Sequence, residues 1–371
     1  MKCIIISENL KKALSIIDHA TGKDSTLPIL GSFLISAENG VITITGTNLE
    51  VGMQTTLRGT IHTQGQVVVP ARPFLGYSAT LPKDEKVTIE SEGNDAKIIT
   101  QSHESLFKGY PPEDFPPFPV VRELYALTCK GSDLSGVLKR TIFSVSKTTV
   151  KPELASISFS FEREILTLAA TDSFRLSEEK IKPIKFSAKL SKTSFLVPVT
   201  SCEELVRLID YSDDENTEFL IGKGEICIKS NDVVLYSRLT EGTFPDYQQI
   251  IPQKFTTSLV VSRSVLAGNM KRASVFANKL SGISIALNPK QKTLTIESKN
   301  SLGTHKASVA ADIQGEALTM VFNYHYFLDG IESYTEDALF LGLNSESQPL
   351  LIRPAKKEGS IYIIMPMKGG A

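Results

Sequence analysis

Apolar residues follow two alternating periods along this chain, and the same order of periods occurs three times. Stretches 8–20, 132–145 and 262–277 have apolar residues three and four positions apart, the spacing of one face of an amphipathic helix. Two anchor residues on this face recur at matching points: Leu10 and Leu14, Leu134 and Leu138, Leu266 and Met270. Each third is therefore predicted to open with a helix, with Ser132 and Ser262 as N-caps of the second and third.

Strand patterns follow each of these helices. Stretches 41–48, 165–172 and 293–300 alternate apolar with small or polar residues, the period of a half-buried strand. Second helical stretches lie within 67–82, 195–210 and 319–334, and closing strands with Gly or Asn turns come next, as at 218–239. The pattern predicts an α+β fold of three tandem helix and antiparallel-sheet domains. We place them at 1–122, 123–253 and 254–371, because proline-rich connecting segments occupy 111–119 and 245–255.

Composition changes this picture little but argues against some classes of protein. Hydrophobic residues make up 41%, charged residues 22%, and the net charge is −1, so there is no global excess of base, although charge can be separated by face. The four cysteines, Cys3, Cys129, Cys202 and Cys227, form no CxxC, which favours reduced thiols over a metal site. No apolar run approaches the length of a membrane span, and the N-terminal one is too short for a signal peptide. We therefore expect a cytoplasmic protein.

The stretch TDSFRLS at 171–177 is the first candidate for reactive chemistry, because Asp172, Ser173 and Arg175 lie within four residues. One hypothesis is an enzyme acting on DNA or on a phosphorylated ligand, with these three residues at its centre. A serine nucleophile needs a base in reach, but the five histidines are scattered, and no P-loop is present. The matching positions of the other repeats hold Asn48 and Asn300, which can form the same turn but cannot act as a base. We therefore predict a structural role for Asp172, no catalytic residue, no metal and no cofactor.

Basic residues gather at non-core positions of the predicted helices. The pairs Lys11-Lys12, Lys139-Arg140 and Lys271-Arg272 recur at matching or nearly matching positions. A solvated helix face explains any one pair, whereas recurrence in three repeats favours a shared surface for phosphate contact without sequence preference. No aromatic stacking platform accompanies these lysines, so duplex contact is expected rather than single-strand binding. The residues predicted to face DNA are Lys11, Lys12, Arg72, Lys139, Arg140, Lys147, Arg207, Arg263, Lys271 and Arg272.

Seven motifs, in order along the chain, resemble those of the bacterial DNA polymerase III beta subunit, the sliding clamp family. They are TLPILGSFLI (26–35), ITGTNLEVGM (44–53), VVVPAR (67–72), ATDSFRL (170–176), EGTFPDYQQIIP (241–252), FNYHYFLDGI (322–331) and YIIMPM (362–367). The resemblance covers essentially the whole length. It implies three-domain protomers that pair head to tail into a closed ring, with helices lining the hole and sheets outside.

The resemblance also implies a hydrophobic pocket that receives short linear motifs of polymerases and of the clamp loader. Matched by motif, the pocket comprises Leu154, Thr171, Ser173, Phe174, Arg175, Leu176, Pro245, Ile250, Leu280, Asn323, Tyr326, Pro349, Ile363, Ile364, Met365, Pro366 and Met367. Methionine suits a lining that accepts several partners. Without the resemblance, a buried final strand explains the IIMPM stretch equally well.

The sequence departs from the family at several positions. Ser173-Phe174 replace a usual Gly-His, which predicts a more apolar pocket. Asp24 and Val199-Thr200 stand where family members often have positive DNA-contacting side chains. The resemblance further implies a dimer interface, which we expect to bring Leu106 and Phe107 of one subunit to Val275 and Phe276 of the other.

The resemblance implies a processivity factor that encircles duplex DNA without reading its sequence. Its expected partners are a second copy of the chain, the DNA polymerase III catalytic subunit, an ATP-driven clamp loader, and other DNA polymerases and repair proteins with clamp-binding motifs. The alternative is a clamp-fold scaffold that binds partners without closing a ring. A monomeric mass would favour that alternative.

Overall fold

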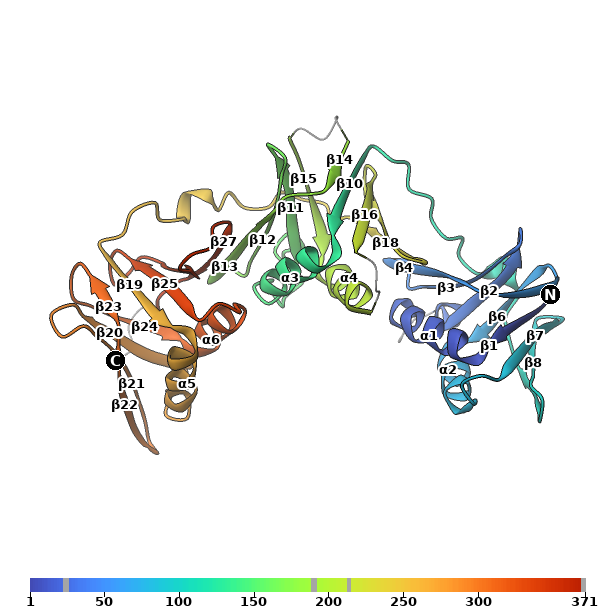
Figure 1. The fold of residues 1–371 in the computed structure, drawn as a ribbon, viewed down its shortest axis with the longest axis horizontal. Coiled ribbons are helices and arrows are strands. Elements are labelled where there is room, and N and C mark those ends of the chain that lie inside the picture. The colour runs from blue at the N-terminus through green and yellow to red at the C-terminus, as the bar shows by residue number, and fades with distance from the viewer. Residues whose placement is uncertain (23–26, 188–191, 212–214, 368–371) are drawn as a thin grey trace. The chain divides into compact units, whose positions relative to one another are not determined.

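The computed structural model describes residues 1–22, 27–187, 192–211 and 215–367. These form two compact units, whose elements are labelled in Figure 1. The first contains Met1–Ser132, Pro183–Leu190 and Glu203–Leu239, and the second contains Asp133–Lys182, Ser191–Cys202 and Thr240–Ala371. The division runs through the middle third of the chain, because strands of that third pair with strands of both neighbouring thirds.

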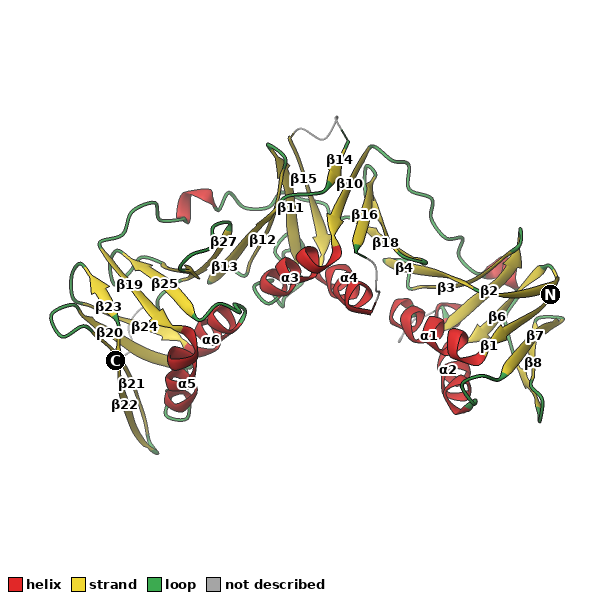
Figure 2. Cartoon of the chain, viewed as in Figure 1, coloured by secondary structure: helices red, strands yellow, loops and turns green. Residues whose placement is uncertain are grey.

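The described part of the chain has two helices in each third, as the periodicity predicts (Figure 2). They are α1 (Ser7–Ile17), α2 (Ala71–Thr80), α3 (Gly131–Ile142), α4 (Val199–Tyr211), α5 (Arg263–Ser274) and α6 (Tyr324–Glu332). Short 3₁₀ turns are η1 (Asp18–Ala20), η2 (Pro28–Gly31), η3 (Pro112–Asp114) and η4 (Gln248–Ile250). No helix among the described residues has the length and apolar character that a membrane crossing requires.

The first unit contains two antiparallel sheets. One has the order β5-β1-β7-β8-β9, with β1 (Lys2–Ile6), β5 (Gly59–Thr63), β7 (Lys86–Glu92), β8 (Asp95–Ile99) and β9 (Glu104–Phe107). The other has the order β14-β10-β16-β17-β18-β4-β3-β2-β6. Its strands are β2 (Ser32–Glu38), β3 (Val41–Thr47), β4 (Val51–Leu57), β6 (Gly65–Pro70), β10 (Tyr125–Lys130), β14 (Lys185–Phe186), β16 (Asn216–Ile221), β17 (Glu225–Ser230) and β18 (Val233–Arg238). The pair β18–β4, with Leu235 opposite Met53, joins strands from two repeats.

The second unit repeats this plan. A long sheet has the order β15-β11-β12-β13-β27-β26-β25-β19-β23, and a shorter one has the order β22-β21-β20-β24. The strands are β11 (Ser156–Glu162), β12 (Ile165–Thr171), β13 (Arg175–Ile181), β15 (Lys192–Pro198), β19 (Thr257–Ser262), β20 (Gly282–Asn288), β21 (Thr293–Asn300), β22 (Gly303–Ala310), β23 (Asp312–Gln314), β24 (Leu318–Asn323), β25 (Ala338–Leu343), β26 (Leu350–Pro354) and β27 (Ser360–Ile364). Here the pair β13–β27, with Leu176 opposite Ile363, joins strands from two repeats.

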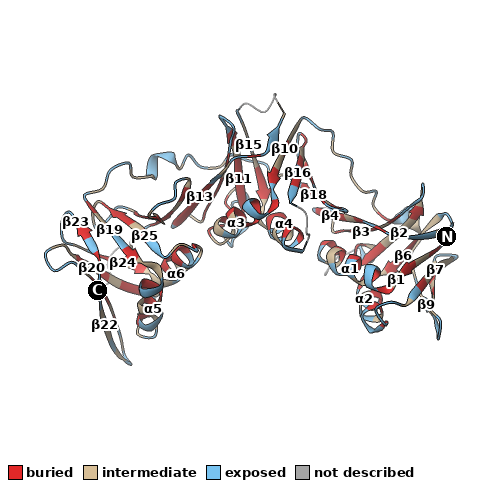
Figure 3. Cartoon of the chain, in the orientation of Figure 1, coloured by how far each residue is buried: buried red, intermediate tan, exposed pale blue. Residues whose placement is uncertain are grey.

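The opening helices α1, α3 and α5 have both buried and exposed positions (Figure 3). Their predicted anchor residues lie in the core. All six are fully buried, and they are the fourth and eighth residues of their helices: Leu10 and Leu14, Leu134 and Leu138, Leu266 and Met270. The predicted cap at Ser262 is confirmed, since its hydroxyl accepts from the amide of Val265. The predicted cap at Ser132 is wrong. Because β10 runs directly into a helix that begins at Gly131, Ser132 lies inside the first turn.

Packing of α6 against β27 gives a stability test at Gly330. A methyl group there would lie 2.1 Å from two ring carbons of Tyr362, a buried side chain whose hydroxyl donates to the carbonyl of Tyr326. We expect Gly330→Ala to lower the free energy of unfolding by about 2 kcal/mol despite the better helix propensity of alanine. Gly76→Ala in α2 is the matched control, because no atom lies within 4 Å of the added methyl group, and it should stabilise by about 1 kcal/mol. Calorimetry gives the melting temperature of both variants. Equal shifts in melting temperature would contradict the close packing of Gly330 against Tyr362.

Candidate functional site

The TDSFRLS stretch forms a tight turn between β12 and β13. The Thr171 hydroxyl donates to the carbonyl of Arg175 at 2.6 Å and accepts from the amide of Ser173 at 3.1 Å. The Asp172 carboxylate accepts from the amides of Phe174 and Arg175, both at 3.0 Å. The backbone of Ser173 is left-handed, with a φ of 77°, a conformation that is uncommon for residues other than glycine. The four hydrogen bonds of the turn stabilise it.

The first repeat has the same turn with an asparagine in place of Asp172. Thr47 donates to the carbonyl of Val51, and the Asn48 side chain accepts from the amides of Glu50 and Val51 at 3.0 and 2.8 Å. Leu49 takes the left-handed position with a φ of 73°. The predicted structural role of Asp172 is thus confirmed, because an amide oxygen makes the same backbone contacts.

Asp172 has one further contact that Asn48 lacks, an ion pair with Arg175. The guanidinium of Arg175 donates to Asp172 at 2.9 Å and to Asp329 of α6 at 2.6 Å, and the side chain is only 5% exposed. Its charge is therefore balanced inside the protein by two carboxylates. Buried charges need such partners, so Arg175 is a bridge between β13 and α6 and does not present a free cation at the surface.

Arg175 is also the centre of a column of flat groups. Its guanidinium lies 5.6 Å from the ring centroid of Phe143 and 4.4 Å from that of Tyr326, distances at which a cation is attracted to an aromatic face. Phe174 in turn stacks on Tyr326, with centroids 6.5 Å apart and planes inclined by 26°. Phe174 is 60% exposed. The column therefore ends in an aromatic ring at the surface.

These contacts bring together many residues of the predicted partner pocket. Leu176 and Arg175 pair with Ile363 and Ile364, and the amide of Met365 donates to the carbonyl of Phe174 at 2.8 Å. Leu154, Thr171, Leu176, Ile363 and Ile364 are buried in their own unit, whereas Pro245, Ile250, Leu280 and Met365 are exposed. Asn323 caps α6, and Pro349, Pro366 and Met367 are half-buried. Their assignment to a pocket stays a prediction.

A buried carboxylate holds the connector, residues 241–256, that includes Pro245 and Ile250. Glu178 of β13 accepts from the hydroxyl of Tyr247 at 2.7 Å and from the side-chain amide of Gln248 at 2.9 Å, and its own side chain is 4% exposed. Burial raises the pKa of Tyr247, and the neighbouring Glu178 carboxylate raises it further. Tyr247 therefore stays protonated and remains a donor. Glu178 fixes the middle of the connector against the sheet.

The next residue, Glu179, faces a different set of donors. It accepts from Arg140 at 2.9 Å and from the hydroxyl of Ser360, and burial raises the pKa of its carboxyl group. Arg140 was predicted to face DNA. Its guanidinium pairs with Glu179 at 2.9 Å, its side chain is 17% exposed, and its contact with DNA stays a prediction.

Several other residues predicted to face DNA also have partners within the protein. Arg207 pairs with Glu204 and Lys271 with Glu332, and Lys11 donates to the carbonyl of Leu81. The basic pair of α1 occupies helix positions five and six, whereas those of α3 and α5 occupy nine and ten, so the recurrence is offset by one turn. Lys12, Arg72, Lys139, Lys147 and Arg272 are exposed, and Arg263 is half-buried. Asp24 lies outside the described residues, while Val199-Thr200 begin α4.

The predicted interface residues fall into two classes. Leu106 of β9 is 51% exposed and Val275 is 63% exposed. Phe107 packs edge-on against Phe74, and Phe276 stacks on His305, so each is anchored in its own unit. No second copy of the chain is present, and the contact between subunits stays a prediction.

Sequence reasoning missed four contributors to this site: Phe143, Glu178, Tyr247 and Asp329. All four lie outside the residues matched by motif as pocket lining. The Arg175–Asp329 contact spans 154 residues, a separation for which a single sequence offers no local signal. An acidic residue inside a buried strand, such as Glu178, was the one available sign, because buried carboxylates nearly always have partners.

Comparisons with known proteins agree in all three parts of the chain. Family profiles described as the N-terminal, central and C-terminal domains of the DNA polymerase III beta subunit match residues 1–119, 128–246 and 248–368. The chain is 28% identical to the beta sliding clamp of Proteus mirabilis over 374 residues, covering 99% of this chain and 100% of that protein. It is 27% identical to the beta sliding clamp of Synechococcus elongatus, covering 99% of each. A DNA polymerase sliding clamp structure from Bacillus subtilis has the same fold, with a TM-score of 0.94, 24% identity and full coverage of both chains.

The dual contact of Asp172 predicts a graded response to substitution. Asp172→Ala removes the carboxylate that accepts from two backbone amides and pairs with Arg175, and we expect it to lower the free energy of unfolding by about 3 kcal/mol. Asp172→Asn keeps a side-chain oxygen that can accept from the two backbone amides, as Asn48 does in the first repeat, and should cost about half as much. Chemical denaturation of both variants gives the comparison. Equal losses would mean that the turn contacts contribute nothing.

The Glu178 contact predicts how firmly the connector is held. Glu178→Ala removes the acceptor of Tyr247 and Gln248, so chymotrypsin should cleave after Tyr247 roughly ten times faster under native conditions, as the loss of about 1.4 kcal/mol of local stability implies. Asp246→Ala is the control, because Asp246 contacts only Gln248 and Gln249 within the connector. Equal cleavage rates for the two variants would show that Glu178 does not hold the connector.

Proposed function

The chain belongs to the DNA polymerase III beta subunit family, and on that premise we propose that it is a DNA sliding clamp, a processivity factor that encircles duplex DNA and tethers the replicative polymerase. The observation that carries the proposal is the match of all three clamp domains in order along the chain, together with curated relatives that are named beta sliding clamps and are covered end to end. Three copies of one helix and sheet plan agree with it.

We propose a homodimer as the working form. The two short sheets end in the edge strands β9 and β22, for which the described residues supply no further partner strand. An unpaired edge strand can form hydrogen bonds with a strand of another chain. Leu106 lies on β9, Val275 directly follows α5, and both are exposed. Head-to-tail pairing of two chains would place β9 of one chain against β22 of the other, so that neither edge strand is left unpaired and the ring closes.

The hold on DNA would then be topological. A closed ring needs no tight phosphate contacts, and tight contacts would oppose sliding. Arg140, Arg207 and Lys271 each pair with a carboxylate of the same chain, which reduces the positive charge they present to DNA. This is consistent with a weak electrostatic contact that does not depend on sequence. The exposed side chains of Lys12, Arg72 and Arg272 would supply this weak contact with the DNA phosphates.

The partner pocket is proposed at the surface end of the aromatic column. Exposed Phe174, Leu280, Ile250 and Met365 supply an apolar surface that can receive short motifs of the polymerase, the clamp loader and repair proteins. Because Asp172 and Asp329 neutralise Arg175, apolar side chains of the partner should contribute most of the affinity.

We further propose that the protein is not an enzyme and acts in the cytoplasm. Asp172 and Arg175 are committed to a turn and an ion-pair bridge, which leaves Ser173 without a base. All four cysteines are buried thiols, which fits a reducing compartment. A separate ATP-driven loader would open the ring.

Ring closure is tested by mass and by retention on DNA. Light scattering should give about 81 kDa, twice the 40.6 kDa of one chain. After loading by the clamp loader of the same organism, the protein should stay on nicked circular DNA and leave once the circle is linearised. Val275→Asp should give monomers and lose retention, whereas Val120→Asp, at a position 93% exposed in the segment between η3 and β10 and outside both edge strands, should change neither. A monomeric wild type, or equal retention on circles and linear DNA, would favour the scaffold alternative.

A further inference from the structure

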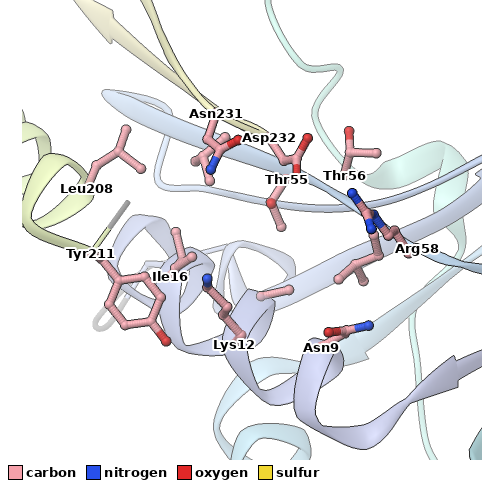
Figure 4. A pocket seen from close by; sticks show the side chains of 13 residues that line it. Asn9, Lys12, Ile16, Thr55, Thr56, Arg58, Leu208, Tyr211, Asn231 and Asp232 are labelled. Atoms are coloured by element: carbon pink, nitrogen blue, oxygen red, sulfur yellow. The ribbon is translucent and has the colours of Figure 1, made fainter. Parts of the chain in front are cut away.

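We propose that the groove beside Tyr211 in the first unit binds single-stranded DNA, one unpaired nucleotide stacking on the Tyr211 ring while Lys12 and Arg58 bind its phosphates. The groove consists of two adjoining cavities. The first, of about 300 Å³, lies among α1, β4, the β17–β18 turn and the end of α4 (Figure 4). The second, of about 370 Å³, shares Ile16, Leu208 and Tyr211 with the first.

Tyr211 is the stacking surface. It is the last residue of α4 and is 49% exposed, although one of its neighbours in the groove, Leu208, is buried. A half-exposed ring above an apolar floor is the arrangement on which nucleic acid bases stack regardless of their identity. Since Tyr211 lines both cavities, successive nucleotides could occupy the groove on either side of the ring, which favours a strand over a lone nucleotide.

Two cations accompany the ring. The ammonium of Lys12 lies 5.4 Å from the ring centroid of Tyr211, and Arg58 lines the opposite side of the first cavity (Figure 4). No carboxylate in the described ranges lies within ion-pair distance of either side chain. In the first cavity Asp232 is the carboxylate of the lining, which leaves an excess of one positive charge there, whereas the second cavity is lined by Glu204, Arg207 and Asp210. The phosphate contacts are therefore assigned to the first cavity. Arginine and lysine beside an aromatic ring match the alternation of phosphate and base along a single strand.

The structure corrects one premise drawn from sequence, that no aromatic ring accompanies these lysines, and the proposed encirclement of duplex DNA is unaffected. The basic pair Lys11-Lys12 has no aromatic residue beside it along the chain, and duplex contact was therefore expected instead of single-strand binding. Folding brings Tyr211 of α4 to Lys12 of α1, about two hundred residues away in sequence. The aromatic partner comes from another repeat.

The inference goes beyond the proposed function, because the groove lies within one unit and needs neither ring closure nor the partner pocket. The test uses the full chain and a fluorescein-labelled ten-nucleotide oligo(dT), with anisotropy measured at low salt. Tyr211→Phe keeps the ring and should bind as the wild type does. Tyr211→Leu removes the ring and should weaken binding roughly tenfold.

Charge variants provide an independent readout on exposed residues that tolerate substitution. Lys12→Gln should weaken binding and reduce its salt dependence by about one phosphate contact. Lys223→Gln, an exposed lysine in the β16–β17 turn away from the groove, should leave both unchanged. Binding that is equal for Tyr211→Leu and Tyr211→Phe would overturn the proposal. So would displacement of the strand by dTMP at an equal concentration of nucleotide, which would instead indicate a mononucleotide site.

The two proposals can fail separately. Tyr211→Leu should still form dimers of about 81 kDa and stay on nicked circles. Loss of strand binding with ring behaviour intact supports the groove as an independent site, and loss of dimer formation in the same variant would contradict it.

Discussion

The pairing of sheet edges between repeats is the constraint on which the rest of the structure depends. A strand at the edge of a sheet exposes unpaired backbone groups, which must bind another strand or water. The middle repeat pairs two of its edge strands with neighbouring repeats, β18 with β4 and β13 with β27. Each long sheet therefore runs continuously from one repeat into the next, and the compact units do not follow the thirds of the sequence.

The pairing of β13 with β27 also assembles the candidate partner site. It sets Arg175 opposite Ile364 and Leu176 opposite Ile363, so residues from the middle and the end of the chain share one surface. Charged side chains of β13 then secure the elements around it: Arg175 reaches α6, Glu178 the connector, and Glu179 the start of β27. Arg175, Glu178 and Glu179 are themselves buried, and each has a hydrogen-bonding partner, which gives the contacts direction as well as strength.

Local periodicity was enough to predict the elements and their threefold order. Helix anchors such as Leu10 and Leu134, and strands such as 165–172, follow from spacing alone. The resemblance supplied most of the candidate site residues. Neither could predict the contacts of Arg175 with Asp329 or of Lys12 with Tyr211, because partners so far apart in sequence depend on how whole sheets align. The cap predicted at Ser132 failed for a local reason, since strand β10 enters its helix without an intervening loop.

The repeated turn explains how one scaffold acquires a site in only one of its copies. The same side-chain to backbone hydrogen bonds form around a left-handed residue at Thr47-Asn48 and at Thr171-Asp172. The turn therefore forms with either a neutral amide or a charged carboxylate. Aspartate differs by also holding a guanidinium, and only in the second repeat does an arginine follow at the required position. That arginine orders Tyr326 and, through it, Phe174 at the surface. A change from amide to carboxylate, paired with one arginine, thus distinguishes a turn that only ends a strand from one that supports a binding surface.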